Sequence, residues 1–138
     1  MRIEETGDID ACRALRRAVF IEEQGIAEAD EWDDLDGQAI HLLAWEEGEP
    51  VGTARILQSG STGKIGRVCV LAQARGTGLG TKLIRAAVDV LRARPGVTHA
   101  RLGAQVHAIG FYEKLGFTVA GEVYDDAGIP HRDMIREL

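Results

Sequence analysis

A glycine-rich segment between an apolar run and an amphipathic stretch most constrains how this chain can fold. Arg75-Gly76-Thr77-Gly78-Leu79-Gly80-Thr81 follows the apolar residues 68–71. Glycine has no Cβ, so it permits positive φ and lets a ligand come close to the backbone. The unpaired N–H groups and the positive dipole end of a helix that starts here favour an anion. We therefore predict a strand–loop–helix unit that binds phosphate, most naturally a pyrophosphate.

The residues after this loop have the spacing of a long helix with one apolar face. Lys82, Arg85, Asp89 and Arg92 point away from that face, and Pro95-Gly96 ends the helix. The apolar face contains Leu79, Leu83, Ala86, Ala87, Val90 and Leu91.

Shorter patterns predict the remaining elements of one domain over 1–138. Asp8 is a good N-cap for a helix that runs to about Phe20, and 21–38 reads as a loop. Strands are expected at 3–6, 41–45, 51–57, 64–71, 99–104, 117–124 and 132–138, with a flexible connection at 59–63 and a short helix at 108–115. The predicted order is β-α-β-β-β-α-β-α-β-β, which is an α+β fold.

Charge and composition exclude several classes of partner. The net charge is −6 and the pI is near 5.2, which argues against binding to nucleic acid or an anionic membrane. No apolar run is long enough to cross a bilayer, and the N-terminus has no apolar signal region, so we expect a cytoplasmic protein. Cys12 and Cys69 are far apart and outside any CxxC pair, so we expect buried free thiols and no metal site.

Three phosphate-binding loop patterns can be compared with this segment. A Rossmann fingerprint and a P-loop both fail, because Thr81 stands where each requires a glycine. The pattern R/Q-x-x-G-x-G/A fits 75–80 completely. The segment therefore resembles motif A of the GNAT acetyltransferase superfamily. Downstream, Phe111-Tyr112-Glu113-Lys114-Leu115-Gly116-Phe117 looks like the late FYEKLGF segment of the same family.

Further segments resemble a narrower group, the ElaA-type GNAT proteins, from about residue 15 to the C-terminus. They are 19–20, 23–24, 41–45, 54–57, 66–68, 102–105 and 128–131. The resemblance implies a three-layer fold with a mixed, mostly antiparallel central sheet of about seven strands and helices on both faces. It also implies an N-acetyltransferase that moves an acetyl group from acetyl-CoA to a primary amine by direct attack in a ternary complex.

The resemblance further implies where coenzyme A binds. The strand before the loop splays from its neighbour, so its free backbone groups pair with pantetheine. Gln105 stands where many members have an asparagine that helps to hold the cofactor, and Arg75 is either a further phosphate contact or a surface arginine. The implied cofactor-binding residues are Val68, Cys69, Val70, Arg75, Gly76, Thr77, Gly78, Gly80, Thr81, Gln105 and Tyr112.

Tyr112 is the expected general acid, because the family's tyrosine at this place lies near the sulfur of coenzyme A. The alternative is a core aromatic on the apolar stripe of its helix. The strand before the loop often supplies a glutamate base, but here it presents Arg67. A base must then come from Glu23, His41 or His107, or the amine loses its proton to solvent.

The acceptor side is expected near the acidic segment 28–36, whose carboxylates would attract a cationic amine. Candidate acceptor-binding residues are Glu23, His41, Arg55, Arg67 and His131. Buried arginines are costly without partners, so Arg55 and Arg67 also fit a structural ion-pair network. Their possible partners are Glu23, Asp33, Asp34 and Asp36.

Two other functions stay open from the sequence. One is a CoA-binding sensor or regulatory module without turnover, and the other is a nucleotide-binding protein that uses the same loop. The expected partner is a small-molecule or peptide amine, and the protein is expected to be a monomer or a homodimer.

Overall fold

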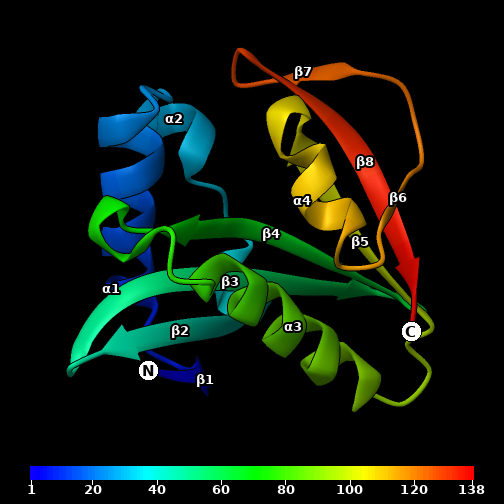
Figure 1. The fold of residues 1–138 in the computed structure, drawn as a ribbon, viewed down its shortest axis with the longest axis horizontal. Coiled ribbons are helices and arrows are strands. Elements are labelled where there is room, and N and C mark those ends of the chain that lie inside the picture. Colours follow the sequence, from blue (N-terminus) through cyan, green and yellow to red (C-terminus); the bar gives the residue numbers. More distant parts are fainter.

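One mixed sheet runs through the molecule in the order β1-β2-β3-β4-β5-β8-β6, and β7 also pairs with β8 (Figure 1). The structure is a computed structural model that describes all 138 residues. The strands are β1 (Arg2–Thr6), β2 (Ile40–Glu46), β3 (Glu49–Ser59), β4 (Thr62–Val70), β5 (His99–Gln105), β6 (Thr118–Val119), β7 (Tyr124–Asp126) and β8 (Ile129–Glu137). The α-helices are α1 (Ile9–Arg16), α2 (Glu28–Glu31), α3 (Leu79–Arg92) and α4 (Ile109–Glu113). Short helical turns are η1 (Arg17–Glu23, π-helical), η2 (Asp36–Gln38), η3 (Ala72–Ala74) and η4 (Val106–Ala108).

Helices cover both faces of the sheet, because side chains alternate along each strand. On β2, Leu42 and Ala44 belong to the large core cluster under α3, whereas Leu43 packs with α1 on the opposite face. Four residues of the expected apolar face of α3 are buried, namely Leu79, Leu83, Ala87 and Leu91. Ala86 and Val90 are only partly buried, and Ile84 and Val88, which were not assigned to that face, are buried too. The α3 layer is therefore the main hydrophobic core, and α1 covers a smaller one.

The only parallel pairing in the sheet joins β4 to β5, and it is short. It extends from Thr62 opposite His99 to Ile65 opposite Leu102. Beyond these residues β4 continues to Val70 and β5 to Gln105 without pairing to each other. Figure 1 shows the two strands diverging, with β4 ending near α1 and β5 leading towards α4. The sheet is therefore split on one side into two halves.

Several sequence-based expectations about the elements were wrong. Residues 21–38 are not a loop: they contain the end of η1, α2 and η2. The segment 59–63 is not a flexible connection but a tight hairpin, in which Ser59 pairs with Thr62. The strand expected over 117–124 is interrupted, which makes eight strands rather than about seven. Both parts pair with β8: Val119 lies opposite Met134, and Tyr124 lies opposite His131. Val119 and Tyr124 are five residues apart, but their partners are only three apart, so the extra residues bulge out between β6 and β7.

No helix is long and apolar enough to cross a membrane. The structure also brings no three His, Cys, Asp or Glu side chains together as a metal site.

Candidate functional site

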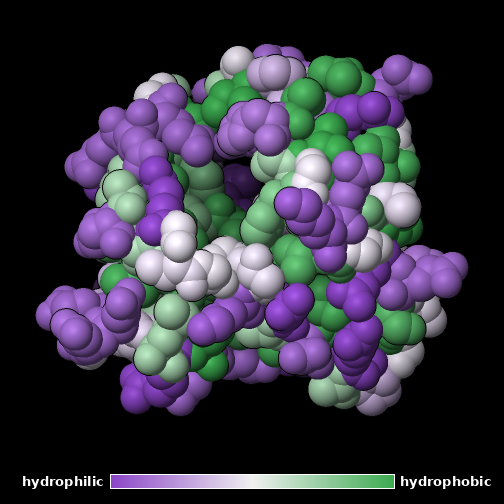
Figure 2. Space-filling model, in the orientation of Figure 1, coloured by the Kyte–Doolittle hydropathy of each residue, from purple (hydrophilic) through white to green (hydrophobic).

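A cleft of about 520 Å³ occupies the gap between β4 and β5. Figure 2 shows its opening near the centre of the molecule, with apolar side chains on its walls. The divergence starts at a bulge: Arg55 and Thr53 of β3 lie opposite Gly66 and Cys69, so β4 carries one extra residue. Arg67 lies within this bulge and has φ of 51°, an uncommon conformation for a residue with a side chain. The backbone of 66–70 therefore has no strand partner on its β5 side.

The glycine loop lies at the end of β4 and forms the start of α3. Gly76 and Gly78 have φ of 79° and 81°, and a Cβ at either position would meet no atom within 4 Å. At Gly80 a Cβ would make an ordinary van der Waals contact with the Phe111 ring, at 3.5 Å. The expected positive φ is confirmed at the first two glycines. The glycines 76–80 and Thr81 do not line the cleft, which reaches Arg75. The open space above Gly76 and Gly78, beside the N-terminus of α3, suits an anion.

Arg75 joins the glycine loop to the cleft, but its charge is already paired. Its Nη atoms donate to both carboxylate oxygens of Glu23 at 2.6 and 2.8 Å, and its Nε donates to the carbonyl of Val70 at 3.0 Å. The hydrogen bonds from Arg75 lower the pKa of the Glu23 carboxyl. Glu23 lines the cleft as expected. Its pairing makes it a weak candidate for a base.

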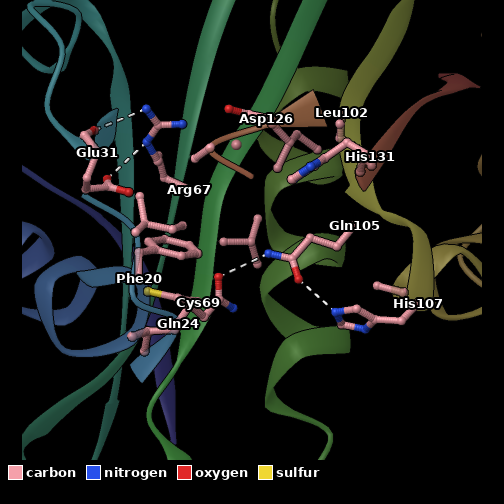
Figure 3. A pocket seen from close by; sticks show the side chains of 18 of the residues that line it. Phe20, Gln24, Glu31, Arg67, Cys69, Leu102, Gln105, His107, Asp126 and His131 are labelled. Carbon is pink, nitrogen blue, oxygen red and sulfur yellow. Dashed lines mark hydrogen bonds and ion pairs between the residues drawn. The ribbon is translucent and has the colours of Figure 1, made fainter. Parts of the chain in front are cut away.

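A chain of side chains crosses the cleft from η1 to β5 (Figure 3). The Gln105 amide donates to Oε1 of Gln24 at 3.1 Å, and Oε1 of Gln105 lies 2.7 Å from Nε2 of His107. Because a carbonyl oxygen only accepts, Nε2 of His107 carries the proton, and the lone pair of the neutral ring is on Nδ1. Gln24 belongs to one of the segments that resemble ElaA-type proteins, but its contact with Gln105 was not expected.

Tyr112 lines the cleft from α4. Its ring makes edge contacts with Phe111 and Phe117, with centroids 5.0 and 6.2 Å away. Burial raises the pKa of the phenol, and the hydroxyl has no hydrogen-bond partner in the protein. Tyr112 thus combines core packing with a hydroxyl that is free to meet a ligand.

His41 and Arg55 do not line the cleft, so their expected place in the acceptor site was wrong. His41 is buried, and its Nε2 lies 2.8 Å from the carbonyl of Asp36. Arg55 is also buried and donates to Asp33 at 2.8 and 2.9 Å and to Asp36 at 3.0 Å. Arg55 belongs to a structural ion-pair network, which is the alternative that the sequence left open, and His41 contacts the backbone of Asp36 beside it.

This network fixes the acidic segment 28–36 against the sheet. Arg16, which is 1% exposed, donates to Glu31 at 2.9 Å and to Asp36 at 2.9 and 3.0 Å. Burial alone would raise the pKa of Asp36, but hydrogen bonds from three arginines hold that pKa far below its usual range. Arg67 joins the network through Glu31, with an Nε–Oε2 distance of 3.1 Å, and it also lines the cleft. The wall of the cleft is therefore held by buried charges.

The sequence analysis missed Tyr124, which lies beside His131 in the cleft. The two rings stack with centroids 5.8 Å apart, and the Tyr124 hydroxyl donates to Asp133 at 2.8 Å. Burial and the hydrogen bond to Asp133 raise the pKa of Tyr124 to about 12. Gly103 makes room for this hydroxyl, because a Cβ there would lie 2.4 Å from it. His131 itself enters the cleft from β8, as expected.

Comparisons with known proteins agree with this fold. A family model described as an acetyltransferase (GNAT) domain matches residues 14–138. The chain is 39% identical to the uncharacterized protein YyaT of Bacillus subtilis (strain 168), over 99% of this chain and 94% of that protein. The crystal structure of Escherichia coli ElaA superposes with a TM-score of 0.88 at 32% identity, over 99% of both chains. An acyl-CoA N-acyltransferase from Pseudomonas aeruginosa gives 0.86 at 33% identity, over 98% and 97% of the two chains. The chain belongs to the GNAT acetyltransferase family.

Proposed function

We propose that this protein transfers an acetyl group from acetyl-CoA to a primary amine, on a small molecule or an exposed amino group, by direct attack in a ternary complex. One observation carries the proposal: the cleft between β4 and β5 starts beside the open N-terminus of α3. A long ligand with a pyrophosphate at one end and a reactive group at the other fits that shape. A relative of similar structure is named an acyl-CoA N-acyltransferase, which supports the same donor.

The residues present suit coenzyme A. The backbone of Gly76, Thr77 and Gly78 and the first turn of α3, with Gly80 and Thr81, would bind the pyrophosphate. Unpaired backbone groups of Val68, Cys69 and Val70 would bind the pantetheine amides, in the manner of an added strand. Gln105 would release Gln24 and use its amide for the ligand. Bound acetyl-CoA supplies the activated acetyl group as a thioester.

Tyr112 would act as the general acid of the reaction. Its hydroxyl is free, and its burial keeps the phenol protonated at neutral pH. It would donate its proton to the sulfur of the leaving group, whose conjugate acid is only slightly stronger than a phenol. A positioned proton donor of this kind contributes about 10²–10⁴-fold to a rate.

Calorimetry with acetyl-CoA and a thiol-release assay over a panel of amines test the proposal. We expect binding by the wild-type protein and turnover with at least one class of amine. Tyr112→Phe should lower kcat at least ~10²-fold with unchanged acetyl-CoA affinity. Tight binding without turnover of any amine would instead indicate a CoA sensor, and preference for ATP or NAD over CoA would refute the donor.

A further inference from the structure

We propose that His131 is the general base that removes the proton from the acceptor amine. The inference rests on the proposed acetyl transfer and assigns the base to a residue that was not among the expected ones. His131 projects from β8 into the cleft, on the side opposite Arg67 (Figure 3). Its position on β8 pairs with Gln105 of β5 on one side and with Tyr124 of β7 on the other. The imidazole therefore stands where the two halves of the sheet separate.

The tautomer of His131 is fixed by one hydrogen bond. Its Nδ1 lies 2.7 Å from the carbonyl oxygen of Ile129, which can only accept. Nδ1 therefore carries the proton, and the lone pair of the neutral ring is on Nε2. That nitrogen has no hydrogen-bond partner within the protein. A base needs this state: a lone pair that faces the substrate and a second nitrogen whose partner sets the ring orientation.

Two of the other histidines differ from His131 in position or support. Nε2 of His41 lies 2.8 Å from a backbone carbonyl away from the cleft. His107 keeps a lone pair on Nδ1, but its ring is exposed and is held only by the Gln105 side chain, whereas His131 is half-buried and held by the backbone. His99 lies outside the cleft, with its Nδ1 next to the hydroxyl of Thr98.

The carboxylates of the cleft divide into two kinds. Glu23 and Glu31 are bound by arginines, which stabilise their charged forms and weaken them as bases. Asp30 and Asp126 are exposed and form no ion pair, so they are suited to attract a cationic amine. Imidazole is the better proton acceptor near neutral pH, since carboxylates are weaker bases.

Three residues hold the imidazole in place without touching the substrate. Tyr124 stacks on the ring of His131 at an interplanar angle of 24°. The Tyr124 hydroxyl is anchored to Asp133, which also accepts from Arg101 at 2.8 Å. These are positioning residues, and the missing side chain at Gly103 is what allows the arrangement.

Charges of both signs line the cleft together with His131. They come from β4, α2 and β7, and β5 adds Arg101, which pairs with Asp133 on the same strand as His131. The charged and titratable groups are Lys64, Arg67, Asp30, Glu31, Tyr124, Asp126, Arg101 and Asp133.

The proton balance assigns one proton to each of two residues. His131 Nε2 takes a proton from the ammonium form of the acceptor and passes it to solvent. The nitrogen lone pair then forms the C–N bond as the C–S bond breaks. The nitrogen loses its second proton to water in that step. Tyr112 delivers its proton to the sulfur and then takes one back from water. The products are an amide, a thiol and one proton released to solvent.

His131→Asn separates a chemical role from a structural one. An asparagine amide can still donate to the Ile129 carbonyl, but it has no atom equivalent to Nε2. We expect kcat to fall about 10²-fold or more with acetyl-CoA affinity and melting temperature unchanged. The fall of kcat/KM towards low pH, the acid limb of the pH profile, should also disappear. His99→Asn, outside the cleft, is the matched control and should keep both the rate and the limb. A His131→Asn variant that retains more than about a third of the wild-type kcat would overturn the proposal, because general bases contribute far more than that.

The tautomer gives a readout that needs no turnover. Long-range ¹H–¹⁵N spectra of the free protein should show Nε2 of His131 as an unprotonated nitrogen and Nδ1 as the protonated one. The opposite tautomer would refute the assignment even if His131→Asn were inactive. If the wild-type protein acetylated no amine while this tautomer was observed, the proposed function would fail and the base role would fall with it. Turnover by the wild-type protein together with an active His131→Asn would refute the base alone.

Discussion

Asp36→Asn should destabilise the protein strongly, although the two side chains have nearly the same shape. Asp36 is 2% exposed and accepts hydrogen bonds from Arg13 at 2.9 Å, Arg16 at 2.9 and 3.0 Å, and Arg55 at 3.0 Å. The amide removes the negative charge and replaces one acceptor oxygen by a donor that faces a guanidinium. Three arginines then lose their shared counter-charge.

The magnitude follows from these contacts. A hydrogen bond to a charged group is worth about 1.5–3 kcal/mol and a neutral one about 0.5–1.5 kcal/mol. Asp36→Asn removes the negative charge that three guanidinium groups share, and two of these groups are buried. We therefore expect a loss of about 3–4 kcal/mol, within the range for breaking a buried ion pair. For a chain of this size, that corresponds to a fall in melting temperature of roughly 10 °C.

Urea unfolding followed by circular dichroism at pH 7 measures this loss. Asp34→Asn is the control, because Asp34 is exposed and forms no ion pair, and it should change stability by less than ~0.5 kcal/mol. The pKa of Asp36 is lowered in the folded protein, so its contribution is present above the unfolded pKa of ~3.9 and is lost as the pH falls below it. The difference in free energy of unfolding between wild type and Asp36→Asn should therefore become smaller from pH 5 towards about pH 2. A difference in free energy of unfolding below ~1 kcal/mol at pH 7, or one that grows in acid, would refute this role of the Asp36 charge.

Three further predictions concern single positions. Gly78→Ala and Gly60→Ala should each cost about 1–2 kcal/mol, because both glycines have positive φ, but only the first should weaken acetyl-CoA binding in calorimetry. Gly103→Ala should displace the Tyr124 hydroxyl, and ultraviolet titration should then find the Tyr124 pKa below its present value of about 12. Burial raises the pKa of the Cys69 thiol to about 12, so thiol reagents should label it only as fast as the protein unfolds, and rapid labelling of the native protein would contradict the structure.

The sequence predicted best where local patterns decide the structure. The apolar spacing after the glycine loop gave a helix that starts at Leu79, as observed, and the positive φ of Gly76 and Gly78 followed from their loop position. The splayed strand was expected from the family resemblance and is present in the pairing of β4 with β5.

The sequence predicted worst where partners lie far apart along the chain. The acidic residues of 28–36 looked like a solvated loop, because their arginine partners come from α1, β3 and β4. Tyr124 carried no local signal: its neighbours in the cleft are Gly103, His131 and Asp133, on two other strands. His41 and Arg55 were placed in the cleft because strand register, which decides the face of a side chain, cannot be read from short apolar runs.

The pairing between β4 and β5 has a mechanical consequence. Four residue pairs, from Thr62–His99 to Ile65–Leu102, are all that join the two lobes of the sheet. We expect this short pairing to act as a hinge. The relative motion of β4 and β5 should then be smallest beside it and should increase towards Val70 and Gln105. A ligand that contacts both strands in the cleft would hold them apart and limit their relative motion. We therefore expect it to slow amide hydrogen exchange most at the far ends of β4 and β5 and least beside the hinge.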